Sequence, residues 1–326
     1  MTSLMLIAAS LLLLFGLPAS QQEPSYQHFL AGNPGDATGK GRGGYVLAGG
    51  GTDQPDAFTW LVSRAGGGDI VVIRASGGDA YNPWIFELGG ADSVETIVFN
   101  DRRAASDPFV IARLRAAEAV FIAGGDQSRY VAFWQGTPVE DELHALVARG
   151  GPIGGTSAGL AIMGEFAFGA RYDSATSKAS LADPFVKEVA LDKDFLALPH
   201  LENVITDSHF VERDRLGRTL VFLARLQHDG WANTPRAIAV DRETAVLVEP
   251  NGHATIVGKN TAYFIRPTVK AEVIATGRPL TMRAIEVYRA DASTTFDLPA
   301  WSGRGGVSYR LDVINGVITS PRGALY

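Results

Sequence analysis

Hydrophobic residues between positions 44 and 150 fall into short, nearly continuous runs that alternate with longer stretches of mixed apolar and polar positions. The continuous runs predict buried strands at residues 45–48, 69–74, 96–99 and 119–123. The mixed stretches predict helices at residues 57–64, 104–117 and 138–149. Strands that are apolar throughout and separated by helices indicate a mostly parallel sheet with helices on both faces, as in doubly wound α/β folds.

The pattern changes in the second half of the chain. A strand at residues 203–206 and a basic helix at 212–227 precede two further strands at 237–241 and 244–248. Beyond residue 254 the sequence predicts only short strands and turns, at residues 254–257, 263–266, 283–288, 307–311 and 317–318. We therefore expect one α/β domain over residues 43–326, with a β-rich C-terminal part at residues 254–326.

The N-terminus has the composition of an export signal. Residues 5–17 are mostly apolar, a length that suits the core of a signal peptide and is too short to span a bilayer. We expect residues 1–20 to be a signal peptide and residues 21–42, which are polar and glycine-rich, to be a linker. The mature protein is then expected to be secreted or periplasmic, with no stable insertion into a membrane.

The net charge and the cysteine content reduce the number of functions that the chain could have. The formal net charge of −6 gives no electrostatic reason to expect binding to nucleic acid. The chain contains no cysteine, which excludes disulfides, a thiolate nucleophile and cysteine-based zinc sites. We expect no metal ion and no cofactor.

One serine lies in the sequence context of a catalytic nucleophile. The segment Gly155-Thr156-Ser157-Ala158-Gly159 fits the G-x-S-x-G nucleophile elbow, a sharp turn between a strand and a helix that exposes the serine hydroxyl. The apolar residues that follow predict the helix, whose N-terminus favours a developing oxyanion. Several predicted strands end in glycine-rich loops, and such ends meet at one edge of a parallel sheet, where ligands bind. We expect the backbone N–H groups of Ala158 and Gly125 to form the oxyanion hole.

A serine nucleophile needs a base, usually a histidine held by a carboxylate. His209 directly follows the strand predicted at 203–206, so it is expected at the same sheet edge as Ser157, with His200 as the second choice. The carboxylate remains open among four residues after the elbow, of which Asp173 is the first choice: Glu165, Asp173, Asp183 and Asp207. Asp207, two residues before His209, also suits a role in substrate binding or structure.

Three arginines follow the predicted base: Arg213, Arg215 and Arg218. Their spacing does not place them on one stripe of a regular helix, and they can converge if the helix starts near residue 213. Arginine can grip a carboxylate with two hydrogen bonds. In an acidic protein, such a cluster near the base favours an anionic substrate.

Taken together, four motifs resemble the serine peptidase family of cyanophycinase and peptidase E (aspartyl dipeptidase). The likeness covers roughly residues 44–250 and rests on Gly124-Gly125-Asp126-Gln127, the elbow around Ser157, Asp207-Ser208-His209-Phe210 with the three arginines, and the segment at residues 237–245. The order and spacing match cyanophycinase better than the shorter peptidase E. The resemblance implies a flavodoxin-like fold related to the class I glutamine amidotransferases, which use cysteine at the elbow.

The resemblance also implies roles and a substrate. Ser157 is implied as nucleophile and His209 as base, and Gln127, Asp207 and the three arginines are implied as substrate contacts. The implied substrate is a peptide with aspartyl units, such as cyanophycin, a poly-aspartate backbone with arginine on each side chain, which is cut to β-Asp-Arg dipeptides. Family members are often homodimers. This chain has Ser208 where the family usually has Gln, and the family's usual triad Glu falls near Asp173.

Three other functions fit parts of the pattern. An isoaspartyl or aspartyl dipeptidase would use the same residues with a smaller pocket. An α/β-hydrolase esterase usually carries an HGGG-type motif, which this chain lacks, and a histidine far toward the C-terminus. A non-catalytic protein of the same fold would use the arginines to hold an acidic ligand.

Overall fold

The computed structural model describes residues 23–326. The signal peptide expected at residues 1–20 lies outside the described residues. Among the residues that are described, no helix is long and apolar enough to cross a membrane.

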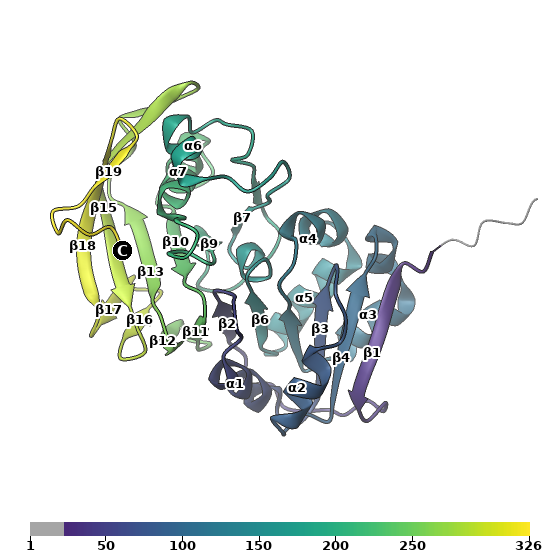
Figure 1. Ribbon diagram of the computed structural model, residues 1–326. Coiled ribbons are helices and arrows are strands. Elements are labelled where there is room, and N and C mark those ends of the chain that lie inside the picture. The colour runs from purple at the N-terminus through teal and green to yellow at the C-terminus, as the bar shows by residue number, and fades with distance from the viewer. Residues whose placement is uncertain (1–22) are drawn as a thin grey trace, which may run out of the picture.

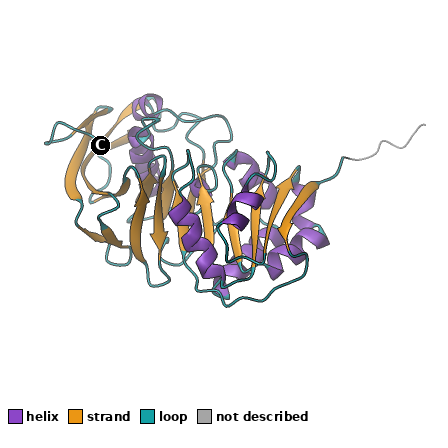
Figure 2. Cartoon of the chain, turned by 60° about the horizontal axis from the view of Figure 1, so that its bottom comes forward, coloured by secondary structure: helices purple, strands orange, loops and turns teal. Residues whose placement is uncertain are grey.

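Five parallel strands form the centre of the first sheet, in the order β4-β3-β5-β6-β2. They are β2 (Tyr45–Ala48), β3 (Asp69–Arg74), β4 (Ser93–Phe99), β5 (Ala119–Ile122) and β6 (Ile153–Thr156). Almost every residue in them is buried, because helices cover both faces. Figure 2 shows these strands between the helices. The predicted α/β fold with a parallel sheet is therefore confirmed.

Alternate residues of each strand pack against different helices. Ile70 and Val72 of β3 belong to one apolar cluster with helices on the first face, α1 (Pro55–Ala65) and α2 (Tyr81–Glu87). Val71 and Ile73 belong to a second cluster with the helices of the other face, α3 (Pro108–Ala116), α4 (Gln127–Trp134) and α5 (Pro138–Ala148). The two-residue period of the strand thus places both sets in apolar surroundings. A short 3-10 helix, η1 (Arg102–Ser106), precedes α3.

Antiparallel strands extend the first sheet at both edges. Beyond β2 lie β11 (Thr244–Val248), β12 (His253–Gly258), β16 (Thr295–Asp297) and β17 (Ser302–Arg304). At the other edge, β1 (Tyr26–Gly32) pairs with β4 along its whole length. The segment expected to be a linker at residues 21–42 therefore contains an edge strand, whose side chains are half-buried or exposed.

A second sheet forms most of the C-terminal half. Its order is β19-β18-β15-β13-β10-β9-β7-β8, and β14 (Val273–Ala275) pairs with β15. The strands are β7 (Phe166–Phe168), β8 (Leu191–Lys193), β9 (Val204–Asp207), β10 (Arg236–Val240), β13 (Ala262–Pro267), β15 (Arg278–Ala290), β18 (Val307–Ile314) and β19 (Val317–Thr319). Helices α6 (Ser177–Ala182) and α7 (Leu216–His228) pack on it. Figure 1 shows the later strands of this sheet, from β10 onward, in green and yellow, so the expected β-rich C-terminal part is present.

One predicted helix is almost absent. The residues after Ser157 form only a short 3-10 helix, η2 (Leu160–Ile162), before β7 begins. Gly159 and Gly164 pack so tightly against neighbouring backbone that an added Cβ would lie 2.1 and 2.4 Å from carbonyl oxygens of Ile122 and Val204. The expected support of an oxyanion by a full helix N-terminus therefore does not apply here.

Candidate active site

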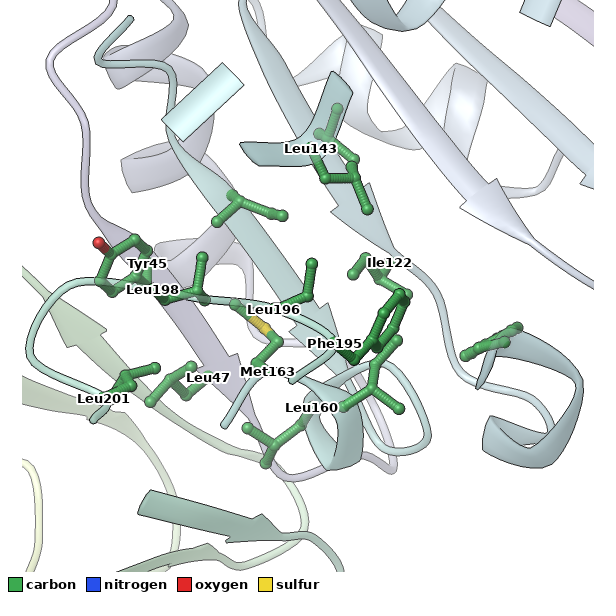
Figure 3. Close-up of a cluster of buried hydrophobic side chains, with 14 of the residues drawn as sticks. Tyr45, Leu47, Ile122, Leu143, Leu160, Met163, Phe195, Leu196, Leu198 and Leu201 are labelled. Atoms are coloured by element: carbon green, nitrogen blue, oxygen red, sulfur yellow. The ribbon is translucent and has the colours of Figure 1, made fainter. Parts of the chain in front are cut away.

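The backbone of Ser157 has the strained geometry of a nucleophile elbow. Its φ is 53°, in the left-handed region that residues other than glycine rarely adopt. The Ser157 N–H donates to the carbonyl of Ala48 at the end of β2, at 3.1 Å. After the turn, Leu160 and Met163 insert into an apolar cluster with Leu47 (Figure 3). Packing in the core thus holds the turn that exposes the serine.

His209 faces Ser157 from the second sheet. It follows β9, has a φ of 46°, and its N–H donates to the carbonyl of Gly49 at 2.8 Å. Adjacent carbonyls, those of Ala48 and Gly49, therefore hold the backbones of the two residues. The Oγ of Ser157 lies 2.9 Å from Nε2 of His209. The site forms where the two sheets meet, on the loop after β2.

Gly50 makes this approach possible. A Cβ at this position would lie 2.4 Å from Nε2 of His209 and 3.0 Å from Cβ of Ser157. Its φ of +95° also favours glycine. The side chains of the pair therefore pack directly over Gly50, a residue that the sequence analysis did not single out.

The carboxylate on the imidazole is Glu212. Its Oε2 lies 2.9 Å from Nδ1 of His209, and its Oε1 accepts from Arg242 Nη1 at 3.3 Å. Asp173 was expected in this place, but it is exposed and accepts from the backbone N–H of Ser174. This corrects the expectation. The other candidates are also engaged elsewhere: Glu165 accepts from Asn203, Asp183 from Phe185 and Asp207 from Arg218.

Burial lowers the pKa of His209 below its ordinary value of 6.5, while the hydrogen bond to Glu212 acts in the opposite direction. The positive charges of Arg213 and Arg215 also lower it. The hydrogen bond to His209 in turn lowers the pKa of Glu212. At neutral pH, His209 is therefore neutral and Glu212 is ionised. Such an imidazole donates from Nδ1 to Glu212 and accepts the Ser157 proton at Nε2.

The two expected oxyanion donors lie beside the serine. Ala158 follows it directly, and Gly125 is in the loop after β5, the strand next to β6. A Cβ on Gly124 would lie 3.5 Å from Cβ of Ser157, so this loop passes close to the nucleophile. Neither N–H group, on Ala158 or on Gly125, hydrogen-bonds to another residue between positions 23 and 326. Both remain available to an oxyanion.

The side chains of Asp207, Arg215 and Arg218, which were expected to contact substrate, are instead engaged with one another and with Ser208. Asp207 and Arg218 have side chains only 3% and 2% exposed and are joined by two hydrogen bonds. Arg215 donates to the carbonyl and the hydroxyl of Ser208, at 2.8 and 3.2 Å. Burial opposes ionisation of Asp207, but Arg218 and Arg215 outweigh it and lower its pKa. These residues form a buried ionic cluster beneath the loop that carries His209.

The remaining predicted residues have different surroundings. Arg213 is exposed and close enough to influence His209, and it has no ion pair with any carboxylate in residues 23–326. Gln127 begins α4 in the loop after Gly125 and is partly exposed. Both stay candidates for substrate contact. His200, the second choice for the base, lies 3.1 Å from the carbonyl of Pro250 through Nε2.

The described part of the chain contains no cluster of three or more His, Asp or Glu side chains that could hold a metal ion. The site consists of a serine, a histidine and a carboxylate in hydrogen-bond contact, with two free backbone N–H groups nearby. This arrangement can carry out nucleophilic acyl transfer.

Comparison with known proteins agrees with this chemistry. The family model of peptidase family S51 matches residues 87–249, which is half of the chain. The chain belongs to peptidase family S51. It is therefore a serine-type peptidase.

The chain is also similar to proteins named cyanophycinase. The chain is 29% identical to a cyanophycinase of Trichormus variabilis over 221 residues, covering 66% of this chain and 68% of the relative. It is 29% identical to a cyanophycinase of Synechococcus elongatus over 241 residues, covering 70% and 69%. The crystal structure of a peptidase from an acI-B1 Actinobacterium is similar in fold, with a TM-score of 0.52 and 16% identity, covering 80% of this chain and 98% of the other.

The role of the carboxylate can be tested through the pH profile of this S51 peptidase. For Glu212→Gln we expect kcat/KM to fall about 10⁴-fold, because the amide no longer fixes the productive tautomer of the ring or stabilises the imidazolium. The acid limb of the wild-type profile should lie below pH 6.5. It should move to still lower pH in Glu212→Gln, because loss of the carboxylate disfavours the protonated ring.

Asp173→Asn is the matched control, since it removes the carboxylate that sequence reasoning favoured. We expect this variant to keep the wild-type kcat/KM and pH profile. A larger loss in Asp173→Asn than in Glu212→Gln would contradict the assignment of Glu212.

Proposed function

We propose that this protein is a serine peptidase of cyanophycinase type, which hydrolyses peptide bonds next to aspartyl units. The observation that carries the proposal is the continuous hydrogen-bonded series from Ser157 through His209 to Glu212, in a chain of the S51 family. The proposed substrate is inferred from the name of the similar proteins, cyanophycinase. We also propose that the protein is exported, on the basis of the apolar run at residues 5–17.

The proposed reaction proceeds through an acyl-enzyme. His209 Nε2 takes the proton of Ser157 as Oγ attacks the peptide carbonyl, and Glu212 stabilises the imidazolium that forms. The N–H groups of Ala158 and Gly125 hold the oxyanion of the tetrahedral intermediate. The imidazolium then protonates the leaving amine. A water molecule, deprotonated by His209, releases the acyl group in the second half of the reaction.

The direct test is release of β-Asp-Arg dipeptide from purified cyanophycin, measured by liquid chromatography and mass spectrometry. We expect release by the wild-type protein and none by Ser157→Ala. Short β-aspartyl peptides and casein are tested in parallel. Cleavage of the short peptides alone would indicate a dipeptidase instead. Cleavage of casein but not of either aspartyl substrate would contradict the proposed specificity.

A further inference from the structure

A cavity of about 640 Å³ lies beside the elbow and has no role in the reaction described above. Four segments form it: the loop after β2, the end of β3 with its following loop, α2, and the loop after β12. Its lining combines aromatic and charged side chains, among them Asp53, Arg74, Tyr81, Trp84 and Lys259. The aromatic side chains offer flat apolar walls, and the charges select among ligands that enter.

Two proximities place the segments that line the cavity near the nucleophile. Asp53 lies next to the side chain of Thr156, the residue before Ser157. On the other side, the loop after β3 approaches the proposed oxyanion hole, because a Cβ on Gly125 would lie 3.7 Å from Oγ of Ser76. A peptide that places its scissile carbonyl at Ser157 can therefore place a neighbouring group in the cavity.

Arg74 is the cation of this cavity that no carboxylate neutralises. Its Nε and Nη1 donate to the backbone carbonyls of Ser76 and Gly78, and its guanidinium lies 5.9 Å from the centre of the Tyr81 ring. No ion pair joins Arg74 to a carboxylate within residues 23–326. Lys259, by contrast, pairs with Glu243 at 2.8 Å. The carbonyls fix the direction of the guanidinium, and Nη2, which lies against Gly77, has no hydrogen-bond partner among residues 23–326.

Asp53 does not supply the missing counter-charge. Its Oδ2 accepts from the hydroxyl of Tyr81 at 2.5 Å. Burial raises the pKa of Asp53, although its hydrogen bonds act in the opposite direction. Asp53 therefore anchors Tyr81 beside Thr156, and the rim of the cavity keeps an unmatched positive charge at Arg74.

Arg74 can take the role that sequence assigned to Arg215 and Arg218, which are occupied by Asp207 and Ser208. We propose that Arg74 binds a carboxylate of the substrate in this cavity, with Tyr81 and Trp84 contacting the attached chain. A fixed guanidinium with a free N–H suits a charge-assisted hydrogen bond to a carboxylate. This inference rests on the proposed peptidase reaction at Ser157, since it concerns the substrate of that same site.

The test measures binding separately from catalysis. Calorimetric titration of the Ser157→Ala protein uses a peptide of two β-Asp-Arg units and the same peptide with its carboxylates amidated. Adding Arg74→Gln should weaken binding of the carboxylate peptide about 10- to 100-fold and leave the amidated peptide unaffected. Arg129→Gln is the matched control, because Arg129 is an exposed arginine whose Nη1 lies 3.4 Å from the carbonyl of Ala75 near the same loop.

Each outcome bears on the inference. The inference is overturned if adding Arg74→Gln to the Ser157→Ala protein leaves the affinity for the carboxylate peptide unchanged. It is also overturned if Arg129→Gln lowers that affinity as much as Arg74→Gln does, because this would indicate a general effect of charge. A third peptide, with uncharged citrulline in place of arginine, tests whether the cavity instead binds the guanidinium of the substrate. If citrulline weakens binding and amidation does not, the cavity holds the guanidinium, and the inference is wrong. Binding that depends on Arg74 without hydrolysis by the wild type would support the inference and contradict the proposed function.

Labelling confirms that the variant is folded. In the protein that retains Ser157, Arg74→Gln should react with a small fluorophosphonate at the wild-type rate, since that probe carries no carboxylate. Loss of fluorophosphonate labelling together with an altered circular dichroism spectrum would show that Arg74→Gln is misfolded. In that case Arg74→Lys replaces Arg74→Gln in the titrations. Lysine keeps the charge but not the planar geometry, so a weakening intermediate between wild type and neutral variants is expected.

Discussion

Replacement of Ser157 by alanine should lower kcat for peptide hydrolysis about 10⁴- to 10⁶-fold, because it removes the atom that forms the acyl-enzyme. His209 and Glu212 cannot compensate, since they act on the proton of the serine and are not placed to attack the carbonyl themselves. The free N–H groups of Ala158 and Gly125 remain, so a small residual rate over the uncatalysed reaction is expected. The measurement is single-turnover hydrolysis of a β-aspartyl peptide at high enzyme concentration.

The fold of the Ser157→Ala protein should be unchanged. The alanine keeps the backbone N–H that donates to Ala48, and the hydroxyl it loses hydrogen-bonds only to His209 among the described residues. Labelling by a fluorophosphonate should disappear, and the unfolding midpoint in urea should stay near that of the wild type. A variant that remained active at more than about a hundredth of the wild-type rate would exclude Ser157 as the nucleophile.

The central sheet could be predicted from sequence because its strands are buried on both faces. The segments of β3 and β5 are continuous apolar runs, and the parallel arrangement follows from the helices between them. The edge strand β1 was missed because it is half-exposed, so polar residues interrupt its pattern. The short helix α2 was missed because Pro83 interrupts a seven-residue segment that packing on the sheet holds in place.

The site could be predicted in part. Ser157 directly follows β6 and His209 lies two residues after β9, so the sequence could place each at the end of a strand. The two strands belong to different sheets, which the sequence did not predict. Glu212 has a local signal, since it lies three residues after His209, but it was not among the four carboxylates considered, of which Asp173 was the first choice. Burial of Arg218 could not be read from sequence, because its partner Asp207 lies on a different element and charged residues normally face solvent.

Loss of the buried ion pair between Asp207 and Arg218 should strongly destabilise the fold. Arg218→Met should lower the free energy of unfolding by about 3–5 kcal/mol, because it leaves the carboxylate of Asp207 buried without its main counter-charge. Methionine keeps most of the contact with the aromatic rings of Phe168 and Phe222, which lie 4.7 and 5.8 Å from the guanidinium, so the loss is mainly electrostatic. The measurement is urea unfolding followed by tryptophan fluorescence at pH 7.

Two comparisons separate this effect from general damage. Arg213→Met, which removes an exposed arginine nearby, should change the free energy of unfolding by less than about 0.5 kcal/mol. Adding Asp207→Asn to Arg218→Met should cost less than the sum of the two single changes, because the second change removes the charge that the first left unpaired. Asp207 has a pKa lowered in the folded protein, so the stabilisation by the pair is present above pH 3.8 and is lost as the pH falls below it. The gap between wild type and Arg218→Met should therefore narrow in acid, and a gap that stays constant there would show that the pair is not its source.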